Sequence, residues 1–409
     1  GDQGAGGIAV CLGKLMLYTQ GAGIAPWHCL PISLDVGTDN EKLLTDSQYL
    51  GWRHRRLEGE EYLSFIGRFV RAFRNVFPNA LCQWEDFSQQ NAFGIRDAFV
   101  DEVISFNDDI QGTGTAALAV ILSAIKVKNE KLTEQRFLIN GAGVGGVGIA
   151  EEIRNALIAE GLSEKQALDN IFMIDSGGLI TSHRDIALYK KKFAKDRKRC
   201  PWIGAINKKD IPEIIHHAGI TVLIGTTGQE YFFRQEAVAA LKENTARPLI
   251  LPLFHHISTP DVFCRNFRKW TNDGILVATS NPCAAKESAE DSFYVSQCNN
   301  AMVFPGVGLG VLISGAREVL PEFFTAAAYS IAEMMTQEDL AAGLLMPPIS
   351  AIRQVGKKVA LAVAMTAVKH GVSRPCVYSD FQHNNDEARM KKLIDRVRWK
   401  PEYLPLIAM

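Results

Sequence analysis

The sequence predicts an α/β protein built around a mostly parallel sheet. Short apolar runs alternate with helix-length segments from residue 137 to residue 278, which is typical of parallel strands joined by helices on both faces. A glycine-rich loop at residues 141–148 follows the first of these runs and opens a helix-length segment. Apolar stripes at helical spacing lie on both sides of this region, at residues 60–77 and 318–335.

Composition restricts the class of protein. A chain of 409 residues predicts two or three domains, and 47% apolar with 22% charged residues argues against global disorder. The 44 basic and 45 acidic residues nearly balance, so we expect no nucleic-acid partner. The longest apolar runs fall short of the ~20 residues of a membrane span, so we expect no membrane contact. None of the eight cysteines forms a C-x-x-C pair, which favours a reducing compartment.

Elements before residue 130 combine apolar segments with isolated charges. Residues 8–18 form an apolar helix whose single charge is Lys14. We expect a buried strand at residues 30–36 and an amphipathic helix at residues 60–77. Two short strands, at residues 80–84 and 103–106, each deliver an acidic pair, and a buried helix follows at residues 112–126.

A regular alternation of strands and helices starts at residue 136. Strand 137–140, helix 145–160 and strand 171–174 make a βαβ unit, and three more strands follow at residues 221–224, 249–253 and 275–278. Pro252 weakens the prediction of the middle strand, because proline cannot donate to a ladder. Beyond residue 304 we expect helices, at 318–335 and 349–370, and we interpret the charge run 190–199 as a solvated face.

The loop Gly-Ala-Gly-Val-Gly-Gly predicts a dinucleotide site. Gly141 permits the tight turn, Gly143 lets the backbone approach a pyrophosphate, and Gly146 allows close helix–strand packing. The alternative is a glycine turn that binds nothing. Asp175 ends the second strand, where an acidic residue hydrogen-bonds the adenine ribose. The alternative role for Asp175 is to cap a following helix.

Two acidic pairs, Glu85-Asp86 and Asp108-Asp109, follow short strands. Carboxylates that converge repel one another, and bound Mg²⁺ or Mn²⁺ relieves this repulsion; the alternative is a pair of solvated loops. Lys14, inside an apolar helix, serves either as a general base or as a lysine whose ammonium reaches water.

Taken together, these motifs resemble the malic enzyme family, to which the malolactic enzymes are closely similar. The resemblance covers nearly the whole chain, and its most specific motif is Phe-Asn-Asp-Asp-Ile-Gln-Gly-Thr at residues 106–113. The further motifs are Gly-Asp-x-Gly at residue 1, Gly-Lys-Leu around Lys14, Leu-Asp-Val-Gly-Thr at 34–38, Trp-Glu-Asp-Phe at 84–87, the glycine loop, and Asn299-Asn300 before Phe-Pro-Gly at 304–306.

The resemblance implies oxidative decarboxylation of L-malate to pyruvate and CO₂ with reduction of NAD(P). It implies that Lys14 is the general base, that Asp108 lies beside it, and that Mn²⁺ or Mg²⁺ binds Glu85, Asp86 and Asp109. Asn299 and Asn300 are the implied substrate-binding residues.

The implied fold is a Rossmann-type dinucleotide-binding domain, residues 108–296, inserted in a split α/β catalytic domain formed by residues 1–107 and 297–409. We expect the family's N-terminal segment, with its acid tyrosine and an arginine, to be absent. We further expect a homo-oligomer that acts on a small molecule, in the cytoplasm or an organellar matrix.

The choice between NADP and NAD and the product of the reaction stay open. Ser176 after Asp175, with Lys190 in the following loop, slightly favours NADP over NAD. His255 stands where the family has an asparagine that touches cofactor or substrate. The alternatives are a malolactic enzyme, which releases lactate, and a dinucleotide-binding protein that has lost catalysis.

Overall fold

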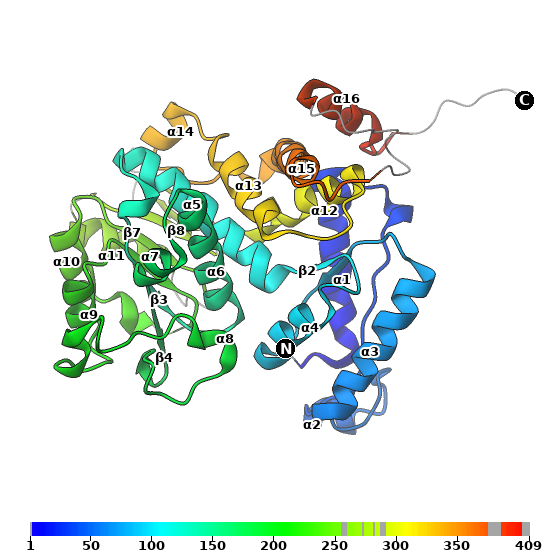
Figure 1. The fold of residues 1–409 in the computed structure, drawn as a ribbon, viewed down its shortest axis with the longest axis horizontal. Helices are drawn as coiled ribbons and strands as arrows, with labels where there is room; N and C mark the ends of the chain where they lie inside the picture. The colour runs from blue at the N-terminus through cyan, green and yellow to red at the C-terminus, as the bar shows by residue number, and fades with distance from the viewer. Residues whose placement is uncertain are drawn as a thin grey trace, which may run out of the picture. The chain divides into compact units, whose positions relative to one another are not determined.

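The computed structural model divides the chain into two compact units (Figure 1). It describes residues 2–228, 230–254, 260–271, 274–280, 283–286, 292–374 and 386–402. Unit 1 comprises Gly1–Phe106, Ala301–Phe323 and Ser350–Met409, and unit 2 comprises Asn107–Asn300 and Phe324–Ile349. The prediction placed residues 297–409 together in a returning segment, whereas the structure groups Phe324–Ile349 with unit 2. One reason is that the Lys126 ammonium donates to the Ala332 carbonyl at 2.8 Å.

Unit 2 contains an eight-stranded sheet in the order β5-β4-β3-β6-β7-β8-β10-β9. Its central strands are parallel, and β5 and β9 pair antiparallel at the two edges. The strands are β3 (Phe137–Asn140), β4 (Ile171–Asp175), β5 (Gly178–Leu179), β6 (Val222–Gly225), β7 (Leu249–Pro252), β8 (Leu276–Thr279), β9 (Cys283–Lys286) and β10 (Ser292–Gln297). Pro252 ends its strand, so the ladder does not need its missing N–H. The chain order reverses between β4 and β6, on either side of β3, which is where this class of sheet binds ligands.

Side chains of alternate strand residues form the core on one face of the sheet, as the two-residue period of strands requires. Leu138, Phe172, Leu223 and Ile250 belong to one buried cluster with residues of the helices α9, α10 and α11. In Figure 1 these three helices lie together beside the strands. The helices of unit 2 are α5 (Thr113–Lys128), α6 (Val144–Ala159), α7 (Glu164–Asp169), α8 (Leu188–Lys191), α9 (Ile211–Ala218), α10 (Gln235–Asn244), α11 (Pro260–Thr271) and α14 (Gln337–Ala341), and α13 (Pro321–Ala332) begins in unit 1.

Helix α5 is buried, as predicted. It continues the π-helical turn η4 (Asp108–Gly112), so the helical stretch Asp108–Lys128 spans 21 residues with a mean hydropathy of 1.5. That length and composition suffice for a membrane span, which corrects the expectation that every apolar run is too short. However, 72% of its most apolar window is buried inside the protein, as in the core helix of a globular unit.

The glycine loop permits the close approach of helix α6 to its neighbours. Gly141 has φ +109°, where L side chains are strained. A Cβ at Gly146 would lie 1.7 Å from the Gly141 carbonyl oxygen, and a Cβ at Gly148 would lie 2.1 Å from the Ile110 carbonyl oxygen. The start of α6 therefore packs directly against backbone carbonyl groups. A side chain added at Gly146 or Gly148 would overlap these groups, which cannot move aside as a flexible side chain can.

We expect Gly146→Ala to lower the free energy of unfolding by about 1–3 kcal/mol, because the new methyl group overlaps the Gly141 carbonyl. Gly145→Ala is the matched control, since its Cβ would meet only the Thr113 methyl group at an ordinary 3.5 Å. The control should leave stability unchanged or raise it by up to about 1 kcal/mol, because alanine is the better helix former. Urea denaturation measures both, and equal losses would contradict this packing.

Unit 1 combines helices with one short two-stranded sheet, β1 (Cys82–Trp84) and β2 (Ser105–Asn107). Its helices are α1 (Ile8–Leu17), the π-helical η2 (Tyr18–Ala22), α2 (Glu41–Thr45), α3 (Gly59–Val76), α4 (Gln89–Phe99), α12 (Phe304–Ser314), α15 (Ile352–Lys369) and α16 (Glu387–Val397). The predicted stripe of α3 is buried through Tyr62, Ile66 and Val70, which pack with Trp84. Seven short 3₁₀ turns are described in the two units: Gly4–Gly7, Pro26–His28, Leu132–Glu134, Pro201–Gly204, Glu230–Phe233, Asn300–Met302 and Ile349–Ala351.

The predicted strand at residues 30–36 is wrong. Residues 30–36 have no regular secondary structure. The two-stranded sheet of this unit is formed by β1 and β2 and does not include them. Only its C-terminal end is tied by backbone, where Leu57 donates to the Val36 carbonyl at 2.9 Å. An apolar run predicts burial, but a strand also needs a partner for its backbone groups, and the sequence pattern does not report that partner.

Candidate functional site

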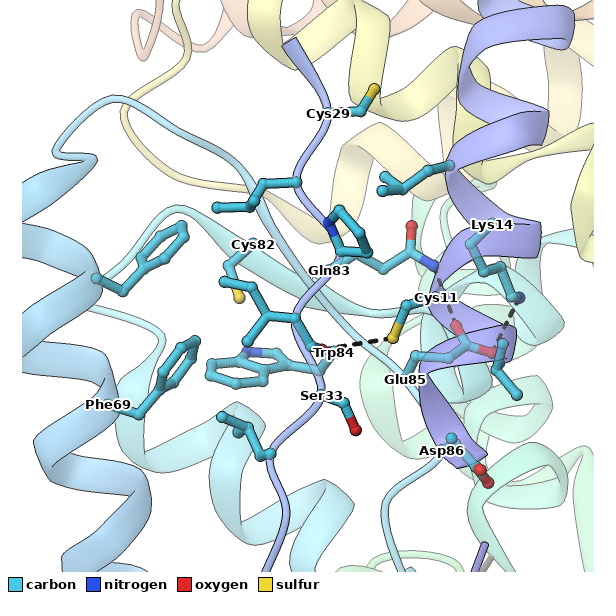
Figure 2. Close-up of a pocket in the computed structure, with 18 of the residues that line it drawn as sticks. Cys11, Lys14, Cys29, Ser33, Phe69, Cys82, Gln83, Trp84, Glu85 and Asp86 are labelled. Atoms are coloured by element: carbon cyan, nitrogen blue, oxygen red, sulfur yellow. Dashed lines mark hydrogen bonds and ion pairs between the residues drawn. The ribbon is translucent and has the colours of Figure 1, made fainter. Parts of the chain in front are cut away.

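A cavity of about 640 Å³ lies within unit 1, a volume typical of ligand sites. Its walls come from α1, residues 30–37, α3, β1 and α12. Figure 2 shows Cys11 and Lys14 on one helix, with Lys14 directed toward Glu85, which directly follows β1. The cavity therefore collects residues that are far apart in the chain, from Gln3 to Leu312.

Lys14 forms an ion pair with Glu85 in this cavity. The Lys14 ammonium lies 3.0 Å from Glu85 Oε1 and 4.7 Å from the centre of the Phe304 ring. The Lys14 side chain is only 17% exposed and that of Glu85 11%. This pairing favours the general-base prediction over a lysine that only extends its ammonium to water. A lysine held against one carboxylate and one aromatic face is positioned to exchange a proton with a ligand in the cavity.

Two residues that the sequence analysis missed hold Glu85 in place. The Gln83 amide donates to Glu85 Oε2 at 3.0 Å, and the Tyr18 hydroxyl donates to Gln83 Oε1 at 2.5 Å. Gln83 lies two residues before Glu85, on the same side of the chain, and Tyr18 lies one helical turn after Lys14. These spacings are the signals that could have identified both residues.

Asp86 has an unusual backbone, with φ +61°. Aspartate tolerates this left-handed region better than most residues, and such conformations concentrate at functional sites. The Gln3 amide donates to Asp86 Oδ2 at 3.4 Å. The start of the chain is itself tied down, because Asp2 accepts from the Thr38 hydroxyl at 2.8 Å and from the Asp39 N–H at 2.7 Å.

The predicted metal ligands come from both units of the chain. Glu85 and Asp86 belong to unit 1, Asp109 belongs to unit 2, and Glu85 pairs with Lys14. Within the described ranges no three His, Cys, Asp or Glu side chains are grouped so that they could hold a metal ion. Their oxygen donors suit Mg²⁺ or Mn²⁺ in kind, and the metal site remains a prediction through which no reaction step is derived.

Asp108 and Asn300 meet in unit 2. The Asn300 amide donates to Asp108 Oδ2 at 2.9 Å, and Asp108 is fully buried. A Cβ at Gly112 would lie 1.8 Å from Asp108 Oδ1, so the carboxylate folds back over its own π-helical turn. The sequence predicted Asp108 and Asn300 as separate parts of one site, and the structure joins them directly. Asn299 precedes this pair and is half-buried.

The glycine loop is placed as a phosphate site requires. Gly143 is the N-cap of α6 and makes no side-chain cap to the first N–H groups of the helix, which are the groups that bind a phosphate at a helix N-terminus. A Cβ at Gly141 would lie 2.3 Å from the Thr226 hydroxyl. The loop therefore packs closely against Thr226, the residue that follows strand β6.

Asp175 lies at the end of β4, next to this loop in the sheet. Its Oδ1 accepts from the Arg184 guanidinium at 2.6 Å and from the Gly177 N–H at 2.9 Å, and its Oδ2 lies 3.5 Å from the Lys190 ammonium. Strand β5 follows, not a helix, so the helix-capping alternative is wrong. Arg184 is a further residue that the sequence analysis missed.

The charge run at residues 190–199 is only partly a solvated face. Lys190 is paired with Asp175, and Lys195 is 6% exposed, with its ammonium 2.5 Å from the Leu168 carbonyl. The interpretation as a solvated face is wrong for these two lysines. Ser176 is exposed at the turn after Asp175. His255 lies outside the described residues.

Comparison with known proteins decides the family. Residues 1–100 match the family model "Malic enzyme, N-terminal domain", and residues 110–368 match "Malic enzyme, NAD binding domain". The chain belongs to the malic enzyme family. The resemblance inferred from the sequence motifs is thereby confirmed.

Relatives in this family extend over almost all of the chain. The NAD-dependent malic enzyme of Shewanella frigidimarina is 38% identical over 405 residues, which are 98% of this chain and 70% of that protein. That of Pseudomonas syringae pv. syringae is 39% identical over 406 residues, with the same coverage.

Solved malic enzymes share the fold. The Entamoeba histolytica structure matches with a TM-score of 0.68 at 22% identity, covering 96% of this chain and 70% of that one. The Pyrococcus horikoshii structure matches with a TM-score of 0.67 at 21% identity, covering 96% and 76%. The predicted α/β fold with a Rossmann-type domain is confirmed.

Proposed function

We propose that this malic enzyme family member converts L-malate to pyruvate and CO₂ and transfers a hydride to NAD⁺. The observation that carries the proposal is the Lys14–Glu85 pair inside a ligand-sized cavity of the unit that matches the malic enzyme N-terminal domain. The names of the relatives, NAD-dependent malic enzyme, support the same reaction.

In this proposal Lys14 first releases to solvent the proton that it holds in the ion pair with Glu85, and the neutral amine then accepts the proton of the malate C2 hydroxyl. The Glu85 carboxylate then stabilises the ammonium that forms, at the 3.0 Å separation seen here. Gln83 and Tyr18 keep Glu85 oriented during the proton transfer. NAD⁺, when bound, supplies the acceptor for the C2 hydride. The resulting ketone lets the C3–C4 bond break, its electrons remain on an enolate, and a proton returned to C3 gives pyruvate.

We propose NAD over NADP as the cofactor. The matched family model is an NAD binding domain, and the relatives are named NAD-dependent. The preference for NADP predicted from Ser176 and Lys190 has no support in these comparisons. Within the structure Lys190 is paired with Asp175, which supports the same choice.

The test is the absorbance of reduced nicotinamide with L-malate and Mn²⁺, run separately with NAD⁺ and NADP⁺ and repeated with chelator. We expect malate-dependent NADH together with pyruvate, and loss of both when the divalent cation is removed, as the family resemblance predicts. Lactate without net NADH would establish the malolactic alternative. Binding of NADH without turnover would establish a dinucleotide-binding protein that has lost catalysis.

We also propose that the protein forms a homo-oligomer in a reducing compartment such as the cytoplasm. Helix α1 is strongly apolar, yet none of its residues is fully buried, and Leu12 and Met16 are 48% and 61% exposed. Trp27 adds a 72% exposed indole. Light scattering should give a mass above the 45.1 kDa of one chain, and a monomer at micromolar concentration would contradict this.

A further inference from the structure

Strand β1 divides the lining of the unit 1 cavity into two faces, because successive side chains of a strand point to opposite sides. Gln83 and Glu85 lie on the face that holds Lys14. Cys82 and Trp84 lie on the opposite face and pack with residues of α3. The cavity volume of about 640 Å³ suits a drug-sized ligand, and malate is much smaller than such ligands. The face of Cys82 and Trp84 has no part in the reaction proposed above.

This second compartment has an aromatic wall. Its residues belong to one hydrophobic cluster and also line the cavity: Leu34, Tyr62, Phe69, Phe73 and Trp84. The centre of the Phe69 ring lies 6.1 Å from that of Trp84 and 5.9 Å from that of Phe73, and Figure 2 shows Phe69 beside the indole. Leu34, Phe69 and Phe73 are only partly buried, so the wall keeps apolar surface that a ligand can cover.

The Trp84 indole carries an unused hydrogen-bond donor. Its side chain is 3% exposed, and its Nε1–H has no hydrogen-bond partner among the residues that the structure describes. Buried donors are almost always paired, and an unpaired one costs free energy. A ligand oxygen that enters between Trp84 and Phe69 would supply the missing acceptor. The unpaired donor therefore points to a ligand independently of the cavity volume.

The charges around the cavity favour an uncharged ligand. The lysine and the arginine that line it are both already paired with carboxylates. Lys14 pairs with Glu85 on the other face of β1, and Arg56 Nη1 lies 3.4 Å from Asp2 Oδ1. An anion buried against the aromatic wall would therefore compete with these carboxylates for its counter-charge, which makes its burial costly.

We propose that the aromatic compartment of unit 1 binds an uncharged aromatic molecule that carries one carbonyl group. The ring of this ligand packs against Phe69 and Phe73, and its carbonyl oxygen accepts from Trp84 Nε1–H. Because the compartment lies on the opposite face of β1 from the Lys14–Glu85 pair, the ligand and malate do not exclude each other. The site is additional to the proposed reaction and does not depend on it.

Calorimetric titration of the full chain with acetophenone and ethylbenzene tests the proposal. Both probes contain a benzene ring and a two-carbon substituent, but only acetophenone has a carbonyl acceptor. Trp84→Phe keeps an aromatic ring and removes the N–H. We expect this variant to bind acetophenone about three- to tenfold more weakly than the wild type, the usual effect of one hydrogen bond, and ethylbenzene within about twofold.

Two controls accompany these titrations. Trp52→Phe is the matched variant, since Trp52 is exposed in the same unit and does not line the cavity, and it should change neither affinity. Benzoate has the same ring with a negative charge and should bind the wild type at least about tenfold more weakly than acetophenone does.

Indole N–H spectra of the isotope-labelled wild type give a readout that needs no variant. The chain has six tryptophans, and the buried Trp84 N–H should exchange slowly with solvent. Acetophenone should shift one slowly exchanging indole signal, and ethylbenzene should leave its proton shift nearly unchanged. Saturating L-malate should change the acetophenone affinity by less than about twofold, since the two ligands occupy opposite faces of β1.

The proposal is overturned if acetophenone does not bind up to its solubility limit, or if no slowly exchanging indole signal moves. Equal weakening of both probes by Trp84→Phe, or the same loss in Trp52→Phe, also overturns it. Competition between acetophenone and malate would show a single shared site and would reject a separate compartment. None of these measurements needs turnover, so failure of the malate assay alone leaves the proposal standing.

Discussion

Replacing Lys14 by methionine should lower kcat for malate oxidation by about 10²–10⁴-fold, the usual contribution of a general base. Methionine keeps the apolar length of the side chain and its contact with Phe304 but cannot accept a proton. Because the glycine loop lies in unit 2, NADH binding should be unchanged. Steady-state kinetics measures the first quantity and fluorescence titration the second.

Lys14→Arg separates proton transfer from charge. Arginine retains an ion pair with Glu85 but is not deprotonated in proteins, so this variant should be as inactive as Lys14→Met. Lys42→Met is the matched control, since Lys42 is exposed on α2 of the same unit. The role of Lys14 as a base would be rejected if Lys14→Arg kept a tenth or more of the wild-type activity, or if Lys42→Met lost as much.

Local rules were sufficient to predict five of the eight strands of the unit 2 sheet, whereas β5, β9 and β10 were not predicted. Strands β3, β4, β6 and β8 are predominantly apolar runs between turns, and Gly141 and Gly146 pack too closely against their neighbours to admit a side chain. Residues 30–36 show the limit of such rules. Their apolarity predicts burial, whereas strand assignment depends on a partner elsewhere in space.

The candidate site was predictable where a single residue differs in kind from its local sequence. Lys14 in an apolar helix and Glu85 after a strand were both recognised, but their ion pair depends on how α1 and β1 pack. Gln83, Tyr18 and Arg184 were missed because a lone amide, hydroxyl or guanidinium is common on surfaces. Their roles become visible only through contacts, such as that of Arg184 with Asp175.

The second large effect is on stability and involves Lys195. This lysine bridges Ile180 and Ser182 through its backbone, while its ammonium lies 4.2 Å from the centre of the Phe172 ring. Burial lowers the pKa of Lys195 to about 7, an effect that Asp169 and Cys200 partly offset and that Arg136 and Arg199 reinforce. The folded protein therefore binds this proton more weakly than the unfolded chain does.

The sign of the pH effect follows from that difference. Between about pH 7 and pH 10 the unfolded chain keeps a proton at Lys195 that the folded protein has released. The contribution of Lys195 to the free energy of unfolding therefore rises with pH in this window, by up to about 1.4 kcal/mol per pH unit. Below pH 7 Lys195 is protonated in both the folded protein and the unfolded chain. The folded protein then buries a charged ammonium, and the stabilisation gained at higher pH is lost.

Lys195→Met should remove this slope, as measured by urea denaturation at several pH values. The substitution also removes the ammonium that donates to the Leu168 carbonyl, at a cost of about 0.5–1.5 kcal/mol that does not depend on pH. The slope and not the absolute stability is therefore the diagnostic quantity. Lys198→Met, an exposed neighbour in the same charge run, changes the net charge equally and should keep the wild-type slope. Parallel pH profiles for the two variants would show that Lys195 carries its proton in the folded protein throughout this window.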